Sequence, residues 1–133
     1  MGPNAPIGQR RNRGLNENYA REVMELHTIG VDAGYSQGDV TELARALTGW
    51  TLIGPRTRAL TPHGEIGDFT FLPILHEPGP RTVLGRVYPA AGQEQGEAIL
   101  RDLAAHPATA RRIAQKLAKH IIADSPPPPA VAR

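Results

Sequence analysis

The sequence has no cysteine, few aromatic residues and no long apolar run. With no cysteine among its 133 residues, disulfides, thiolate metal sites and a cysteine nucleophile are excluded within this chain. No stretch approaches the roughly 18 apolar residues that cross a bilayer, so we expect no transmembrane segment. Polar residues follow the pair Arg10 and Arg11, where an export signal needs an apolar stretch. We therefore expect no signal peptide in this chain.

Neither sign of charge is in large excess. The chain has 15 Lys and Arg against 13 Asp and Glu, which gives a net charge of +2. Two groups of basic residues are candidates for phosphate contacts, but no recognition-helix motif, glycine-rich phosphate loop or G-x-S-x-G nucleophile motif accompanies them. The two groups are Arg10, Arg11 and Arg13, and the helix face of Arg112, Lys116 and Lys119. The sequence therefore predicts no nucleic-acid partner.

Four segments have the apolar periodicity of helices. Ser36 followed by Asp39 resembles a capping box, and Gly30 and Gly49 are placed to end the first two helices. His106 occupies the cap position of the last one. The predicted helices cover residues 17–28, 37–48, 93–105 and 107–123.

All four predicted helices have apolar residues that we expect to face a core, and in the helix over 93–105 these are Ala98, Ile99 and Leu103. Within the helix over 93–105, Gly96 is a weak position that costs up to about 1 kcal/mol relative to Ala. The stripes are Tyr19, Val23 and Leu26 in the first helix; Val40, Leu43, Ala44 and Leu47 in the second; and Ala110, Ile113, Ala114, Leu117 and Ile121 in the last.

Residues 51–92 differ from the rest because their prolines forbid a long helix. Phe69 and Phe71 alternate with polar neighbours as in a short strand, and residues 82–84 and 86–88 offer partners across Gly85. The fold class predicted is mainly α: four helices, in two helical pairs, joined by a long Pro/Gly-rich segment with a small β-hairpin.

The chain divides into three parts. Residues 1–14 read as an extended lead-in, and residues 15–125 as a helical domain fragment that includes 51–92 as an irregular insert with a hairpin. Residues 126–133 read as the proline-rich start of a truncated further helix.

Several motifs in this order resemble a known family. They are RGLNENYARE at 13–22, MELHT at 24–28, Gly30 with Val31, Tyr35, and DVTELARALTGW at 39–50. Further along come Phe69 and Phe71, His76 with Pro78 and Gly79, residues 82–85, and residues 106–110. From Arg13 to Val131 the chain resembles the bacterial family called domain of unknown function 1800.

The resemblance implies an architecture without a mechanism. Members of that family are usually several times longer, largely helical and commonly exported, and they have no settled activity. This implies a periplasmic or cell-envelope location and makes the chain an internal piece of a longer domain. The sequence departs from the family where members often have Leu, Gly and Phe, at Val23, Ala33 and Ile121.

A group of histidines and glutamates is the best candidate for chemistry. Glu22, Glu25, His27 and His76 are the catalytic candidates, and His27, His76 and Glu77 are the metal-ligand candidates. Ligands from one helix need a spacing of three or four, but His27 is two residues from Glu25 and five from Glu22. The alternative is that His27 caps the helix end. The sequence indicates no particular cofactor.

The aromatic residues also allow two interpretations. Trp50 follows a predicted helix as a core anchor whose ring N–H finds an acceptor, or it lines a ligand pocket. Phe69, Phe71 and Tyr88 fit a small apolar cluster under the long insert.

Apolar residues are as dense in the predicted loops as in the predicted helices. The helical spans contain 12 Leu, Ile, Val and Phe in 54 residues, and the other 79 residues contain 17. Loops this apolar fold over the helices or meet another surface. We therefore expect a structural or interaction module of a larger exported bacterial protein, docking on the remainder of a longer domain or on a protein partner. The alternative is a metal-assisted hydrolase or redox enzyme with a His/Glu site.

Overall fold

The computed structural model describes residues 4–5, 15–61 and 63–122. In these residues it contains four helices and two pairs of short strands. The helices are α2 (Asn18–Glu22), continued by the π-helical turn η1 (Val23–His27), then α3 (Gln37–Ala46), α4 (Gln93–Ala105) and α5 (Pro107–Ile121). The strands are β1 (Trp50–Leu52), β2 (Phe69–Phe71), β3 (Arg81–Val83) and β4 (Arg86–Tyr88). None of these helices is long and apolar enough to cross a membrane.

Three short 3-10 turns complete the described structure: η2 (Val31–Ala33), η3 (Arg58–Leu60) and η4 (Pro73–Leu75). The predicted lead-in over 1–14, apart from Asn4 and Ala5, lies outside the described residues, as does the predicted helix start over 126–133.

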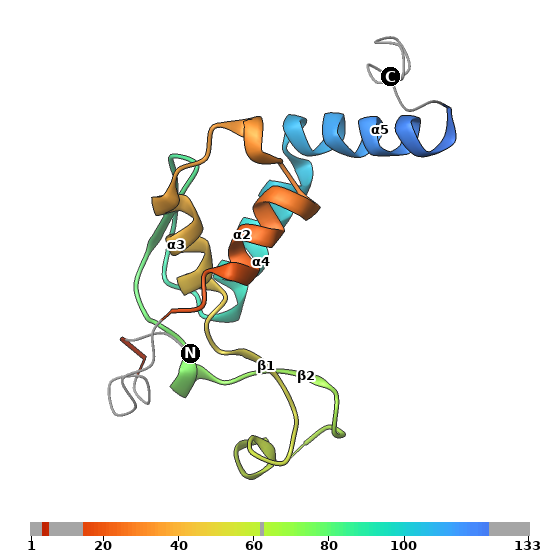
Figure 1. The fold of residues 1–133 in the computed structure, drawn as a ribbon. Coiled ribbons are helices and arrows are strands. Elements are labelled where there is room, and N and C mark those ends of the chain that lie inside the picture. The colour runs from red at the N-terminus through yellow and green to blue at the C-terminus, as the bar shows by residue number, and fades with distance from the viewer. Residues whose placement is uncertain (1–3, 6–14, 62, 123–133) are drawn as a thin grey trace.

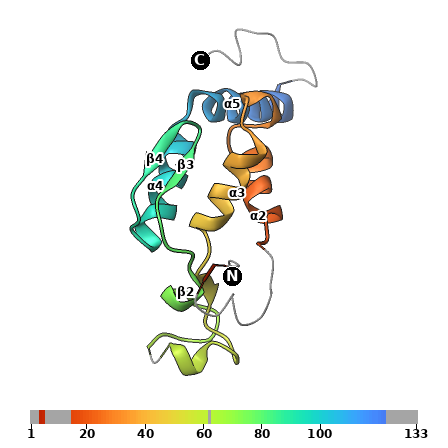
Figure 2. The ribbon, with the colours of Figure 1, turned by 90° about the vertical axis from the view of Figure 1, so that its left-hand side faces the viewer.

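Helix α3 lies between α2 and α4, and the β3–β4 hairpin packs against α3 and α4 (Figures 1 and 2). Helix α5 extends sideways from the end of α4, away from this body (Figure 1). The core sits among α2, η1, α3, α4 and the β3–β4 hairpin. Its largest fully buried apolar side chains are Met24, Val40, Leu43, Val83, Ile99 and Leu103.

The first helix departs from its predicted register. Tyr19 and Leu26, expected in the core, are 59% and 49% exposed, whereas Ala20 and Met24 are buried. Only Val23 of the predicted stripe is buried. A π-helical turn contains more residues than an α-helical one, so periodicity read at 3.6 residues per turn misplaces Leu26, which lies within η1. Tyr19 lies before this turn, in α2, where its neighbour Ala20 takes the buried position. Gly30 has a positive φ of 84° and its N–H donates to the Met24 carbonyl, which ends the helix where predicted.

The predicted caps, the bounds of α4 and the stripe of α3 agree with the structure, whereas the stripe predicted for the last helix is wrong, because Ile113, Leu117 and Ile121 are exposed. Ser36 and Asp39 form the full capping box of α3. Helix α4 has the predicted bounds, and the His106 side chain accepts from Ala108 N–H at the start of α5. The predicted stripe of α3 is buried: Val40, Leu43, Ala44 and Leu47.

The hairpin predicted across Gly85 is present, but the partner predicted for the strand Phe69–Phe71 is wrong. Phe69–Phe71 pairs antiparallel with Trp50–Leu52, with Thr51 opposite Thr70, and Arg81–Val83 pairs with Arg86–Tyr88 instead. The described insert therefore contains two antiparallel pairs where one small hairpin was expected. Leu84 and Gly85 both have positive φ, 50° and 75°, which is the two-residue turn that closes a tight hairpin on itself.

The predicted cluster of Phe69, Phe71 and Tyr88 is divided between the two strand pairs. The rings of Trp50 and Phe69 meet edge to face at 5.2 Å, and Phe71 meets His76 at 5.3 Å. Tyr88 belongs to the other strand pair, where its hydroxyl donates to Asp102. The Trp50 ring N–H is buried without a hydrogen-bond partner in the described residues, so the expected acceptor is absent there.

Candidate functional site

A buried polar cluster joins the end of α3 to the segment that follows η4. His76 Nδ1 lies 2.8 Å from the Thr48 carbonyl oxygen, and both residues are buried. Since a carbonyl only accepts, this contact places the proton of the neutral ring on Nδ1. The Thr48 hydroxyl donates to the Arg45 carbonyl (2.6 Å) and accepts from Glu77 N–H (2.8 Å). One threonine therefore fixes the backbone on both sides of the contact.

The Glu77 carboxylate is almost completely buried in this cluster, with 2% of its side chain exposed. Oε1 accepts from Asn4 N–H at 3.1 Å, and Oε2 lies 3.4 Å from Arg45 Nε without hydrogen-bond geometry. Arg45 also pairs with Glu42 at 2.6 Å. Arg81 donates to the Glu77 and Pro78 carbonyls, at 2.8 and 3.0 Å.

The charges of this cluster balance, because the carboxylates of Glu42 and Glu77 face the guanidinium groups of Arg45 and Arg81. Most of its polar atoms bind one another or the backbone. Such an arrangement holds a chain segment in place and leaves little free for a substrate.

The other predicted site residues lie elsewhere. Glu25 accepts from the Tyr35 hydroxyl at 2.6 Å and lies 3.8 Å from Arg21. Burial, followed by this hydrogen bond, raises the pKa of Tyr35. His27 and Glu22 are exposed, and the His27 side chain forms no hydrogen bond to the described residues. Turn η1, which contains His27, lies beside α5, whereas η4 and the residue after it lie at the other end of the helical body, near β2 (Figures 1 and 2).

The structure thus brings His76 and Glu77 together with arginines, and leaves Glu22, Glu25 and His27 apart from them. Across the described ranges, no group of three or more His, Asp or Glu side chains is arranged to hold a metal ion. The His/Glu enzyme hypothesis therefore gains no support from this placement. Sequence reasoning missed Thr48, Arg45 and Arg81, because only the fold brings residues 45–48 beside 76–81.

Helix α5 has the most regular exposed apolar surface of the described helices. Ile113, Leu117 and Ile121 recur every four residues and are 47%, 55% and 73% exposed. We call these three side chains the α5 stripe. The basic side of α5 faces the body instead: Lys116 Nζ donates to the Leu26 carbonyl at 2.8 Å, at the end of η1. The residues that we expected to face a core therefore face outward.

The sequence matches the family described as "Protein of unknown function (DUF1800)" over residues 3–133. The chain belongs to the DUF1800 family. The resemblance found in its motifs is thereby confirmed. No curated protein matches the chain, and no solved structure does.

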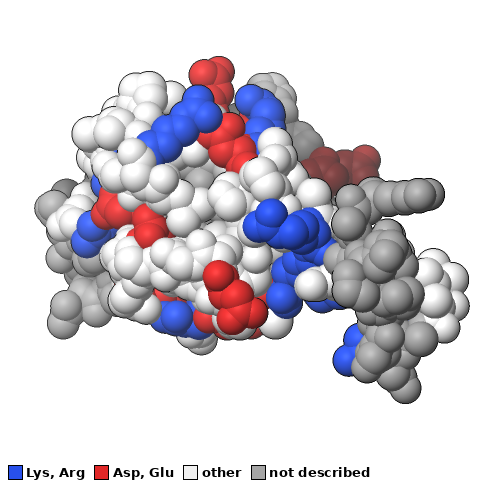
Figure 3. Space-filling view, turned by 90° about the horizontal axis from the view of Figure 1, so that it is seen from above, with Lys and Arg blue, Asp and Glu red and all other residues white. Residues whose placement is uncertain are grey.

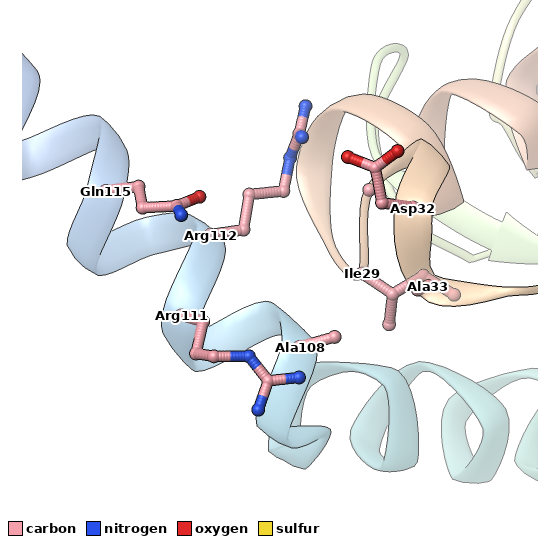
Figure 4. A pocket seen from close by; sticks show the side chains of 8 residues that line it. Ile29, Asp32, Ala33, Ala108, Arg111, Arg112 and Gln115 are labelled. Atoms are coloured by element: carbon pink, nitrogen blue, oxygen red, sulfur yellow. The ribbon is translucent and has the colours of Figure 1, made fainter. Parts of the chain in front are cut away.

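This DUF1800 chain also has a cleft between α5 and η2 (Figure 4). Its volume is about 200 Å³. Arg111, Arg112 and Gln115 reach it from α5, and Asp32 stands on the opposite side (Figure 4). The rest of its lining is small or apolar: Ile29, Gly30, Ala33 and Ala108. Sequence reasoning placed Arg112 on a solvated face and gave no reason to pair it with the Gly30 turn.

Proposed function

We propose that this chain is an interaction module within a larger, exported bacterial protein, and that its α5 stripe docks on an apolar protein surface bordered by acidic side chains. The exposure of Ile113, Leu117 and Ile121 on a single helix face carries this proposal. The larger, exported setting is what the family resemblance implies.

Docking the stripe removes apolar surface from water. Full burial of an Ile or Leu side chain contributes about 1.5–3 kcal/mol, and each stripe residue has about half or more of its surface still to bury. The insert does not supply the cover, since Leu52 and Ile66 within it are themselves 60% and 73% exposed. The sequence allowed two outcomes: the apolar loops fold over the helices, or they meet another surface. The exposure of these side chains supports the second outcome.

The field of α5 favours an acidic partner, although Arg112 and Lys116 lie on the side of the helix away from the stripe. This helix contains four Lys or Arg residues and no Asp or Glu. A partner surface with acidic residues around its apolar centre is attracted to this helix, and a basic one is repelled. Apolar contacts at spacing four indicate a helix as the docked element.

The test uses a fluorescein-labelled synthetic helix with Leu at spacings of three and four and Glu at the other exposed positions. We expect fluorescence polarisation to show saturable binding of this peptide to the intact chain. We expect no binding of a scrambled peptide of the same composition, and weaker binding of a peptide with Lys in place of Glu. Equal binding of the scrambled peptide contradicts the proposal.

A matched pair of variants locates the binding surface. Ile121→Lys and Ile66→Lys replace the same residue type at the same exposure, 73%, on α5 and in the insert respectively. We expect about tenfold weaker peptide binding for Ile121→Lys and no change for Ile66→Lys. Equal effects overturn the assignment to α5. So does a dimer that Ile121→Lys dissociates, or tighter binding to vesicles of anionic lipid than to the peptide.

A further inference from the structure

The fold holds the guanidinium group of Arg112 at the cleft between α5 and η2, but the described residues supply no acceptor for its Nε–H. Gly30 has a φ of 84°, and a Cβ at this position would lie 2.8 Å from Arg112 Nη1. The glycine thus leaves the space through which the Arg112 side chain passes. Arg112 Nε is buried and has no hydrogen-bond partner among the described residues. A buried N–H of a charged group is costly when it has no acceptor.

The electrostatics of the cleft favour an anion. Neither Arg111 nor Arg112 forms an ion pair within the described part of the chain, although Asp32 lines the opposite side. The two lining arginines lie within the first six residues of α5, nearer the positive end of the helix dipole. On the molecular face seen from above, Lys and Arg side chains gather in one area, and Asp and Glu side chains lie elsewhere on that face (Figure 3).

We propose that this cleft binds the oxyanion of a small molecule, a carboxylate or a phosphate. The two Nη atoms of Arg112 donate to two oxygens of the ligand, the end-on bidentate geometry that a guanidinium offers, because Nε is too buried to contact a ligand in the cleft. Arg111, whose side chain lines another part of the same cleft (Figure 4), supplies the second positive charge.

This site is independent of the proposed docking surface. At about 100° per residue, Arg111, Arg112 and Gln115 lie on the opposite side of α5 from Ile113, Leu117 and Ile121. Either proposal can therefore fail without the other.

The experiment follows the Arg Nε–H signals of the intact chain by NMR during titration with inorganic phosphate and, separately, with acetate, at constant ionic strength. We expect a saturable shift of the Arg112 signal with at least one of the two anions, and the stronger binder identifies the ligand class. Arg101, exposed on α4 and 3.2 Å from Glu97, is the internal reference. Equal, unsaturated shifts of both arginines mean weak surface screening and overturn the proposal.

Substitutions separate the contribution of the bidentate guanidinium geometry to anion binding from the contribution of its positive charge. We expect Arg112→Lys, which keeps the charge but loses the guanidinium, to weaken binding about tenfold as followed at the Arg111 Nε–H signal, and Arg101→Gln to leave binding unchanged. Arg111→Gln, monitored at the Arg112 signal, should weaken binding more mildly and keeps the test available if Arg112 variants unfold. Unchanged affinity in both Arg112→Lys and Arg111→Gln overturns the proposal.

Discussion

Asp39 Oδ1 accepts a hydrogen bond of 2.7 Å from Leu84 N–H, which ties the start of α3 to the turn of the β3–β4 hairpin. The other carboxylate oxygen, Oδ2, accepts from Ser36 N–H and from the Ser36 hydroxyl, at 2.7 and 2.6 Å. One carboxylate thus caps a helix and also holds Leu84, a non-glycine residue at φ 50°. A local capping signal and a long-range contact depend on the same side chain.

Asp39→Asn should destabilise the chain at neutral pH and make little difference in acid. Burial by itself raises the pKa of Asp39, but the hydrogen bonds from Ser36 and Leu84 outweigh it and lower the pKa below its ordinary value of 3.8. A lowered pKa means stability that is present above 3.8 and lost as pH falls through the folded value. We expect a loss of about 0.5–2 kcal/mol at pH 7, the usual cost of losing a cap.

Urea denaturation of both proteins at pH 7 and pH 3 measures this difference. The gap between wild type and Asp39→Asn should narrow at the lower pH. A gap of the same size at both values contradicts the role given to the ionised carboxylate.

Gly96→Ala should destabilise the chain, which reverses the expectation from helix propensity. A Cβ at Gly96 would lie 3.0 Å from Trp50 Cζ2 and 3.3 Å from the Ala46 carbonyl oxygen, because α4 passes close to α3 and β1 at this point. Overpacking of this kind costs about 1–3 kcal/mol, more than the roughly 1 kcal/mol that Ala gains in a helix.

Gly38→Ala is the matched control. Gly38 is exposed in the first turn of α3, with only Ser36 Oγ within 4 Å, at 3.4 Å. We expect this change to be neutral or to stabilise by up to about 1 kcal/mol. Thermal melts of the two variants should therefore shift in opposite directions, and a gain for Gly96→Ala would show that Trp50 moves aside.

Glu77→Gln tests whether the buried cluster is structural. The change keeps the size of the side chain but leaves Arg45 with Glu42 as its ion-pair partner and removes a charge from the interior. We expect a loss of up to about 3 kcal/mol, toward the low end for breaking a buried ion pair, because Glu42 remains. Exposed Glu22 supplies the control, since Glu22→Gln should change the free energy of unfolding by less than about 0.5 kcal/mol. Similar urea midpoints for the two variants would contradict the structural role of Glu77.

The Tyr88 hydroxyl should ionise at a higher pH than an ordinary tyrosine. Burial, followed by the hydrogen bond to Asp102, raises the pKa of Tyr88 to about 12. The stability that this provides is complete below pH 10, the ordinary value, and is lost as pH rises through about 12. In an absorbance titration of tyrosinate, Asp102→Asn should move the Tyr88 step down toward 10, whereas Asp68→Asn should leave it in place. An unmoved step in Asp102→Asn would remove Asp102 as a cause.

The sequence was a good guide wherever a signal is local. The capping box of Ser36 and Asp39, the stop at Gly30, the cap at His106 and the bounds of α4 depend on backbone chemistry within a few residues. The core stripe of α3 could be found because its period is a regular 3.6 residues. Leu26 of the first helix could not be placed this way, because the π-helical turn from Val23 to His27 breaks that period.

Pairing between distant segments could not be read from the sequence. Strand β2 takes β1 as its partner because the turn at Leu84 and Gly85 closes β3 onto β4. His76 and Glu77 were predicted as candidates for chemistry, but only the fold sets them against Thr48 and Arg45 and away from the turn that contains His27.

The sequence by itself determined the family, the four helices and their caps, because these depend on residues close together in the chain. The tertiary structure alone decided which apolar faces find a partner. Helix α5 has a stripe as regular as that of α3, yet α3 is enclosed by its neighbours, whereas α5 contacts the body through Lys116 and its first turns. Periodicity fixes which residues share a face, and only the packing of the other helices decides whether that face is covered.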